Sequence, residues 1–179
     1  SVASKSSAFA VIIRIFYTSF SNEDLMLDWS LIFAVLAAIT MTLGNLFALN
    51  QKNIKRLLGY STIAQAGYIL IGLAAIPGTN SINFSGIQGS MYYLAGYLFT
   101  NMSIFIVITI IITRTKDETI EGLSGFIKIS PVYSIILVVG LLSLIGMPPT
   151  VGFMSKVIIF GFAINSGYPW LALVGVVNS

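Results

Sequence analysis

The sequence predicts an all-α polytopic membrane protein in which one transmembrane helix is broken. Of its 179 residues, 56% are apolar and only 8% are charged, whereas soluble domains carry about a quarter charged residues. A water-exposed surface with nine basic and six acidic side chains would stay largely apolar, which excludes an ordinary cytosolic enzyme. The apolar residues also form runs long enough to cross a bilayer, which takes about 20 helical residues.

Charged or turn-rich segments separate these apolar runs. We expect helices at about residues 3–20, 29–49, 57–76, 91–113, 132–166 and 169–179, all within one membrane domain covering 1–179. Four runs have the length of a single crossing, the fifth is too long, and the last is only the start of a span. The start of the chain, with Lys5 inside an apolar run, does not resemble a signal peptide, and the last apolar run stops after about ten residues, too few for a crossing. We therefore expect the chain to be a piece of a longer membrane protein.

The charges between the runs predict how the chain is threaded. The segment at 50–56 is basic and the one at 114–130 is mixed, with three basic and three acidic residues, whereas 21–28 is acidic and 77–90 is uncharged. Because basic loops are retained on the cytoplasmic or matrix side of a membrane, we expect 50–56 and 114–130 to lie together on the inner side.

The fifth run contains the sequence GMPPT near its middle, with Gly146, Pro148 and Pro149. Two adjacent prolines remove two backbone donors and disfavour the helical conformation of the residue before each proline. The pattern predicts a helix broken at 146–150, with carbonyl groups that must face protein or a water-filled cavity. The alternative is a tight turn outside the membrane that joins two short helices.

Two lysines lie where a charge is costly. Lys5 and Lys156 sit within apolar runs without acidic neighbours in sequence, and a lysine at the centre of a bilayer costs about 2.5 to 3.5 kcal/mol. Lysine can exchange a proton when its surroundings change, so both are candidates for a proton relay. The alternative is that each extends its amine to the membrane surface.

Polar side chains on the third and fourth runs could line a path between the lysines. The candidates are Tyr60, Ser61, Thr62, Gln65, Tyr97, Thr100, Asn101 and Ser103. Hydroxyl and amide side chains also commonly join membrane helices by hydrogen bonds, which is the simpler interpretation of each taken alone.

Several kinds of site are not expected in this chain. It has no cysteine and no histidine, so thiolate-bound iron–sulfur clusters, histidine-bound haem and ordinary zinc sites are excluded. No glycine-rich phosphate loop or nucleophile motif occurs. A net charge of +3 without a basic face makes nucleic acid an unexpected partner.

Four stretches carry a family resemblance. They are SKSSAFAVIIRIF, GNLFALNQKNIKRLLGYSTIAQAGYILIG, YLAGYLFTN and LSLIGMPPTVGFMSKVIIF, and together they resemble the subunit N family of respiratory complex I, called NADH dehydrogenase subunit 2 in mitochondria. The resemblance implies the C-terminal half of an antiporter-like helical bundle, from helix 8 to the start of helix 13. It identifies Lys5 with the lysine that links two half-channels and Lys156 with the lysine of the broken helix. Many members have histidine where this chain has Gln65.

The resemblance also implies a function and partners. The chain would be a proton-translocating subunit of NADH:quinone oxidoreductase in a mitochondrial inner membrane or bacterial plasma membrane. NADH, FMN, iron–sulfur clusters and quinone would bind other subunits, and this chain would hold no cofactor or metal. Its partners would be lipids, the other membrane subunits and whatever supplies the missing N-terminal helices. The alternatives are a subunit of a multi-component cation/proton antiporter or membrane-bound hydrogenase, or a non-conducting structural subunit.

Overall fold

The computed structural model describes residues 2–19, 23–75 and 86–179, and these residues are arranged as helices without strands. The predicted all-α class is confirmed. The helices are α1 (Val2–Ser19), α2 (Glu23–Leu49), α3 (Ile54–Ala74), α4 (Gly86–Thr115), the 3-10 turn η1 (Glu121–Leu123), α5 (Phe126–Ile129), α6 (Pro131–Ile145), α7 (Val151–Asn165) and α8 (Pro169–Val177).

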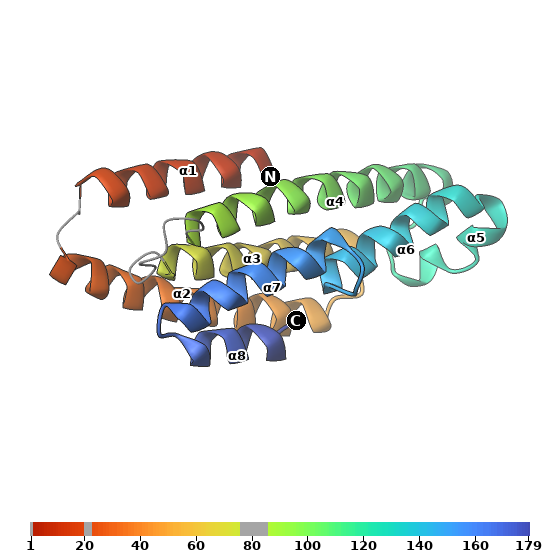
Figure 1. Cartoon of the computed structure of the whole chain (residues 1–179). Coiled ribbons are helices and arrows are strands. Elements are labelled where there is room, and N and C mark those ends of the chain that lie inside the picture. Colours follow the sequence, from red (N-terminus) through yellow and green to blue (C-terminus); the bar gives the residue numbers. More distant parts are fainter. Residues whose placement is uncertain (1, 20–22, 76–85) are drawn as a thin grey trace.

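The long helices run along one common direction, and successive ones alternate up and down (Figure 1). The connection from α2 to α3 lies at the same end as the segment that holds η1 and α5. Here the Ile54 amide donates to the Glu118 carbonyl (3.0 Å) and the Ile120 amide donates to the Lys52 carbonyl (3.0 Å). The two connections that we expected on one side are thus bonded to each other.

Several helix limits differ from the expected ones. Helix α2 begins at Glu23 rather than at residue 29, so residues 23–28, expected in a loop, form its first turns, where acidic residues favour the positive end of the helix dipole. Residues 86–90, also expected in a loop, belong to α4. The remaining parts of those two expected loops, 20–22 and 76–85, lie outside the described residues.

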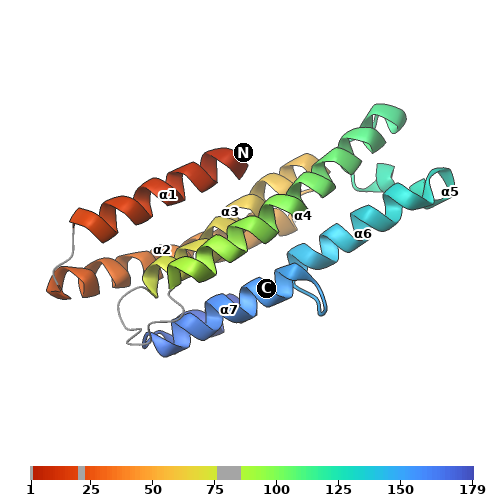
Figure 2. The ribbon, with the colours of Figure 1, turned by 45° about the horizontal axis from the view of Figure 1, so that its top comes forward.

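Among the described residues, three helices are long and apolar enough to cross a membrane: Asp28–Leu49, Ile54–Ala74 and Gly86–Thr115. Helices α6 and α7 have 15 residues each and lie end to end (Figures 1 and 2). The single helix α4 packs against both of them. This arrangement fits one interrupted span, whereas the alternative of a surface turn would place two short helices side by side.

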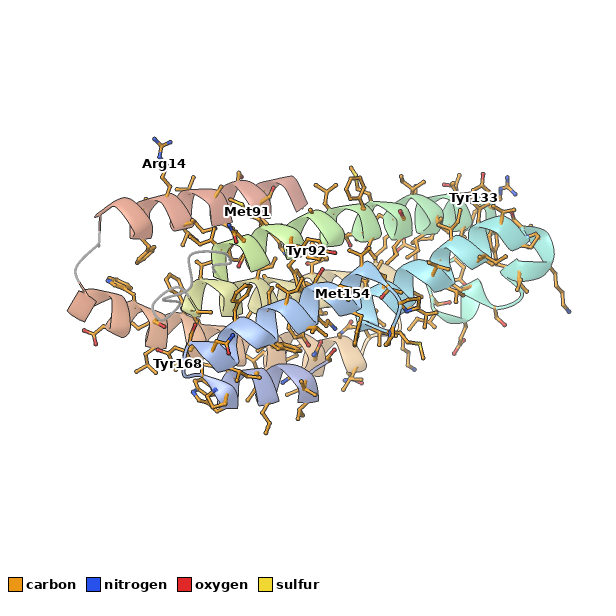
Figure 3. All side chains as sticks on the ribbon, viewed as in Figure 1. Arg14, Met91, Tyr92, Tyr133, Met154 and Tyr168 are labelled. Atoms are coloured by element: carbon orange, nitrogen blue, oxygen red, sulfur yellow. The ribbon has the colours of Figure 1, made fainter. Side chains whose placement is uncertain are left out.

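The outer surface of the bundle is apolar. More than half of the side chain is exposed at Met91 and nearly half at Tyr92 and Met154 (Figure 3). The buried core instead joins α2, α3, α4, α7 and α8 through residues such as Met41 and Tyr68. An apolar exterior around a core with buried polar residues is what a bilayer requires.

Candidate functional site

The break between α6 and α7 leaves backbone acceptors inside the bundle. Helix α6 ends at Ile145 and is followed by its C-cap residue Gly146, which has a left-handed φ of +88°. Its amide donates to the Leu142 carbonyl (3.0 Å), as does the amide of Met147 (3.0 Å). At the other side of the break, the Thr150 hydroxyl caps α7 by accepting from the Phe153 amide. The last carbonyls of α6 are left without partners in the helix.

Lys156 supplies the missing donors. It lies in the second turn of α7 and is only 5% exposed. Its Nζ donates to the carbonyls of Ile145 (2.7 Å) and Leu144 (3.2 Å), and to Ser179 Oγ (2.7 Å). The amine therefore turns back to the break and is buried inside the bundle. Every partner that the structure describes for it is uncharged, and the negative end of the α6 dipole faces it.

Helix α3 lies between the two lysines. Lys5 Nζ donates to the Thr62 carbonyl on one side of this helix. One turn later, Gln65 Nε2 donates to the Leu144 carbonyl (3.4 Å), which also accepts from Lys156. The Tyr93 hydroxyl donates to Gln65 Oε1. A single turn of α3 thus separates Thr62, whose carbonyl binds Lys5, from Gln65, which shares the Leu144 carbonyl with Lys156.

A cavity of about 290 Å³ opens beside Lys156. We call it the Lys156 cavity. Polar side chains from α2, α3, α7 and the end of the chain line it together with apolar residues of α3 and α6: Asn45, Leu57, Leu58, Ser61, Gln65, Tyr68, Leu141, Leu144, Ile145, Lys156, Asn178 and Ser179. Ser61, Gln65 and Tyr68 follow the i, i+4, i+7 spacing of one helix face. The cavity can hold several water molecules, each of which occupies about 30 Å³.

A second, smaller space of about 10 Å³ also borders Gln65. This Tyr97 cavity is lined by Gln65, Tyr93, Gly96, Tyr97, Thr100, Ser143, Leu144, Gly152 and Ser155. The Tyr97 hydroxyl is buried and has no hydrogen-bond partner among the described residues. Gln65 and Leu144 line both cavities, and Gln65 is the one of these two with a polar side chain.

Three other candidates lie elsewhere. Tyr60 does not line the Lys156 cavity; its ring lies 5.7 Å from that of Phe47, and it lines an open surface depression together with Arg56. Asn101 is buried on α4 but lines neither cavity. Ser103 is exposed and donates to the Phe99 carbonyl of its own helix, the local hydrogen bond that we gave as the simpler interpretation.

The sequence reasoning missed Tyr68 and Tyr93. Both were available from spacing: Tyr68 continues the face of Ser61 and Gln65 on α3, and Tyr93 lies one turn before Tyr97 on α4. Ser143 and Ser155, which line the Tyr97 cavity, had no comparable signal because each is a single small residue in an apolar run.

Residues 1–179 match the family described as NADH:quinone oxidoreductase/Mrp antiporter, transmembrane region. The chain belongs to this family. It is 43% identical over 180 residues to NADH-quinone oxidoreductase subunit N from Dehalococcoides mccartyi, covering 100% of this chain and 37% of that protein. It is also 43% identical over 179 residues to subunit N 2 from Symbiobacterium thermophilum, covering 100% of this chain and 35% of that protein. This chain thus spans about a third of the length of these two relatives.

Solved structures share the fold. A chain of the Mrp complex from Dietzia sp. DQ12-45-1b is 27% identical, with a TM-score of 0.85 over 96% of this chain and 30% of that chain. A chain of the membrane-bound sulfane sulfur reductase, an archaeal respiratory membrane complex, has a TM-score of 0.75 at 24% identity, covering 84% of this chain and 30% of that one. The antiporter-like bundle implied by the sequence resemblance is therefore the observed fold.

Proposed function

We propose that this chain is part of a proton-translocating membrane subunit, subunit N, of an NADH:quinone oxidoreductase. Its role in that complex is to pass protons through Lys5, Lys156 and the cavities around Gln65, driven by quinone reduction elsewhere. The family membership and the relatives named subunit N support the assignment to this complex.

The observation that carries the proposal is the environment of Lys156. The side chain is buried, bonded only to neutral groups among the described residues, and borders a cavity of about 290 Å³. A lysine kept solely for packing would be replaced by an apolar residue at a gain in stability, because burying a cation is costly. A proton carrier needs the opposite arrangement, in which water can reach the amine and its charged form is only moderately stabilised.

Lys5 and Gln65 complete the proposed route. Lys5 binds the Thr62 carbonyl, one turn of α3 from Gln65, which joins the Leu144 carbonyl near Lys156. Glutamine does not accept a proton near neutral pH but can orient water through its amide. In this proposal Gln65 holds water between the two cavities and the lysines carry the charge.

The partners and location follow from the same assignment. Other membrane subunits of the complex and lipids would surround this chain, and nucleic acid would not be a partner. The bacterial relatives favour a bacterial plasma membrane over a mitochondrial one. NADH, FMN, iron–sulfur clusters and quinone would bind elsewhere, since this chain has neither cysteine nor histidine to ligate a cluster.

A cation/proton antiporter subunit is the second candidate, favoured by the similarity to a chain of an Mrp complex. A broken helix and a buried lysine suit both functions. The identity of 43% to subunit N proteins, against 27% to the Mrp chain, favours the oxidoreductase.

The test is the number of protons pumped per NADH oxidised in membranes with normal amounts of the complex. Lys156→Met keeps the volume of the side chain and removes the amine, and it should lower this ratio. Lys128→Met is the matched control, because Lys128 is exposed in the connection between α4 and α6, and it should leave the ratio unchanged. An unchanged ratio in Lys156→Met would favour the structural, non-conducting role.

A further inference from the structure

An aromatic ring faces the amine of Lys156. The Nζ atom lies 4.9 Å from the centre of the Tyr68 ring, within the distance of about 6 Å at which a cation is attracted to an aromatic face. Tyr68 lies on α3 and is only 2% exposed. The contact therefore takes place away from bulk water, where this attraction is stronger than at a protein surface.

The other contacts of the amine come from different elements. Two of its three donors bind carbonyls at the end of α6, and the third binds Ser179 Oγ after α8. Carbonyl and hydroxyl oxygens can also accept from an uncharged amine, which still carries N–H groups. The ring face differs from them, because its attraction depends on the positive charge. Between the two side chains described in contact with the amine, Tyr68 and Ser179, the ring of Tyr68 is thus the one whose attraction requires the positive charge.

The ring is held firmly in place. The Tyr68 hydroxyl donates to the Gly175 carbonyl on α8 (3.4 Å). The ring stacks with Tyr93 at 6.2 Å and 24°, and lies 6.2 Å from the ring of Phe160. Contacts with α4, α7 and α8 therefore fix the orientation of the ring that faces the lysine amine.

We propose that Tyr68 is a positioning residue for Lys156: its ring face holds the protonated amine at the break and releases the neutral amine toward the Lys156 cavity. The inference rests on the proposed function, because it gives a purpose to a change of charge at Lys156. Tyr68 lines the same cavity as Ser61 and Gln65, so an amine that leaves the ring remains next to these polar groups.

A series of variants separates the proposed positioning role of Tyr68 from a purely structural role. Tyr68→Phe keeps the ring and loses only the hydroxyl, and should pump nearly as well as the wild type. Tyr68→Leu removes the ring, and should slow pumping by roughly twofold to thirtyfold, the range that corresponds to the strength of a cation–π contact. Tyr92→Leu, on the exposed face of α4, is the control for loss of a tyrosine.

Fluorinated phenylalanines keep the test decisive even where Tyr68→Leu fails to assemble. Adding one, two and three fluorine atoms to phenylalanine at position 68 weakens the attraction of the ring for cations and changes its shape very little. Pumping in the assembled complex should fall stepwise with fluorine number, and the steps should vanish in the Lys156→Met background. Equal pumping across the series would overturn the inference about Tyr68.

The two proposals fail in different ways. When Lys156→Met lowers the proton ratio and the fluorinated series is flat, the role of Tyr68 is wrong and the proposed function stands. When Lys156→Met leaves the ratio unchanged, the proposed function is wrong, and the inference about Tyr68 falls with it.

Discussion

The Nζ atom of Lys156 lies 2.7 Å from the carbonyl oxygen of Ile145, the last residue of α6. The second half of the broken helix thus provides the cation that closes the first half. A helix terminus carries a partial negative charge of about half a unit, so the backbone takes over part of the role of a carboxylate. Because a partial charge stabilises the amine less than a full one, this arrangement leaves the proton of Lys156 easier to release than an ion pair would.

Gly146 provides the first prediction. Its φ of +88° is left-handed, and an added Cβ would lie 2.9 Å from Lys156 Cδ. Gly146→Ala should destabilise the subunit by about 1 to 2 kcal/mol through backbone strain, and should also lower pumping by displacing the lysine. The measurements are the thermal midpoint of the purified complex and the proton ratio.

Gly161→Ala is the control for Gly146→Ala. It lies in α7, where an added Cβ would have no neighbour within 4 Å. Alanine favours a helix over glycine by about 1 kcal/mol, so this variant should be as stable as the wild type or slightly more stable. Equal behaviour of the two variants would contradict a special role for Gly146.

Gly152 should be more sensitive than Gly146. A Cβ at this position would lie 1.7 Å from the Ser143 carbonyl oxygen, and a backbone atom cannot move aside as a flexible side chain can. We expect Gly152→Ala to cost about 3 kcal/mol or more, at the upper end of overpacking effects, and to reduce the amount of the subunit in membranes. Wild-type levels measured by immunoblot would show that α6 and α7 can separate at this point.

The sequence was sufficient for the features that depend on composition and on proline. Long apolar runs predicted the spans, and the pair Pro148 and Pro149 predicted where one of them is interrupted, because proline has no amide hydrogen to donate. The sequence also places Lys156 inside an apolar run, and the side chain is only 5% exposed in the structure. The acidic residues of 23–28 predict a loop between two apolar runs, but they lie in α2 because an acid is favourable in the first turn of a helix.

The partners of Lys156 could not be predicted from the sequence. The carbonyls of Leu144 and Ile145 belong to the backbone, which every residue shares, so no residue type marks them. The ring of Tyr68 contacts the lysine across 88 positions of sequence, and only the packing of α3 against α7 brings them together. Helical spacing places Tyr68 on the face of Gln65 but does not say which helix that face meets.

Lys5 allows a relay to be distinguished from a structural donor. Its Nζ donates to the Thr62 carbonyl, and arginine at this position would keep a donor and a charge. Because a guanidinium stays protonated in proteins, we expect Lys5→Arg to lower the proton ratio to roughly half or less, as Lys5→Met should. Full pumping by Lys5→Arg together with loss in Lys5→Met would mean that the lysine serves only as a hydrogen-bond donor.

The contact between the α2–α3 connection and the segment that follows α4 should depend on pH. Hydrogen bonds from Lys55 and Asn53 hold the pKa of the exposed Glu118 carboxyl below its usual range. A lowered pKa means that the contact stabilises the folded state above the ordinary glutamate pKa of about 4.3 and is lost as the pH falls through the lowered value.

Amide exchange at Ile54 and Ile120, whose amides join the two connections, measures this contact. Near neutral pH, Glu118→Gln should exchange faster than the wild type, by a small factor because exposed ion pairs are weak. The difference should close in acid, and Glu121→Gln, in the neighbouring turn η1, should behave as the wild type. A difference that persists in acid would mean that the carboxylate charge is not what joins the connections.

The final prediction concerns the Tyr97 hydroxyl, which is buried without a partner among the described residues beside a space of about 10 Å³. Such a volume is near the lower limit of about 10 to 15 Å³ for one water, which needs two to four polar partners. Thr100 Oγ1 and Ser143 Oγ, 3.3 Å apart, line the same space. We therefore expect a high-resolution cryo-EM map of the complex to contain one ordered water at Tyr97 Oη. Tyr97→Phe should remove this water, and the control Tyr92→Phe should not. A map that shows other buried waters but none at Tyr97 Oη would contradict the assignment of Tyr97 to a hydrated path.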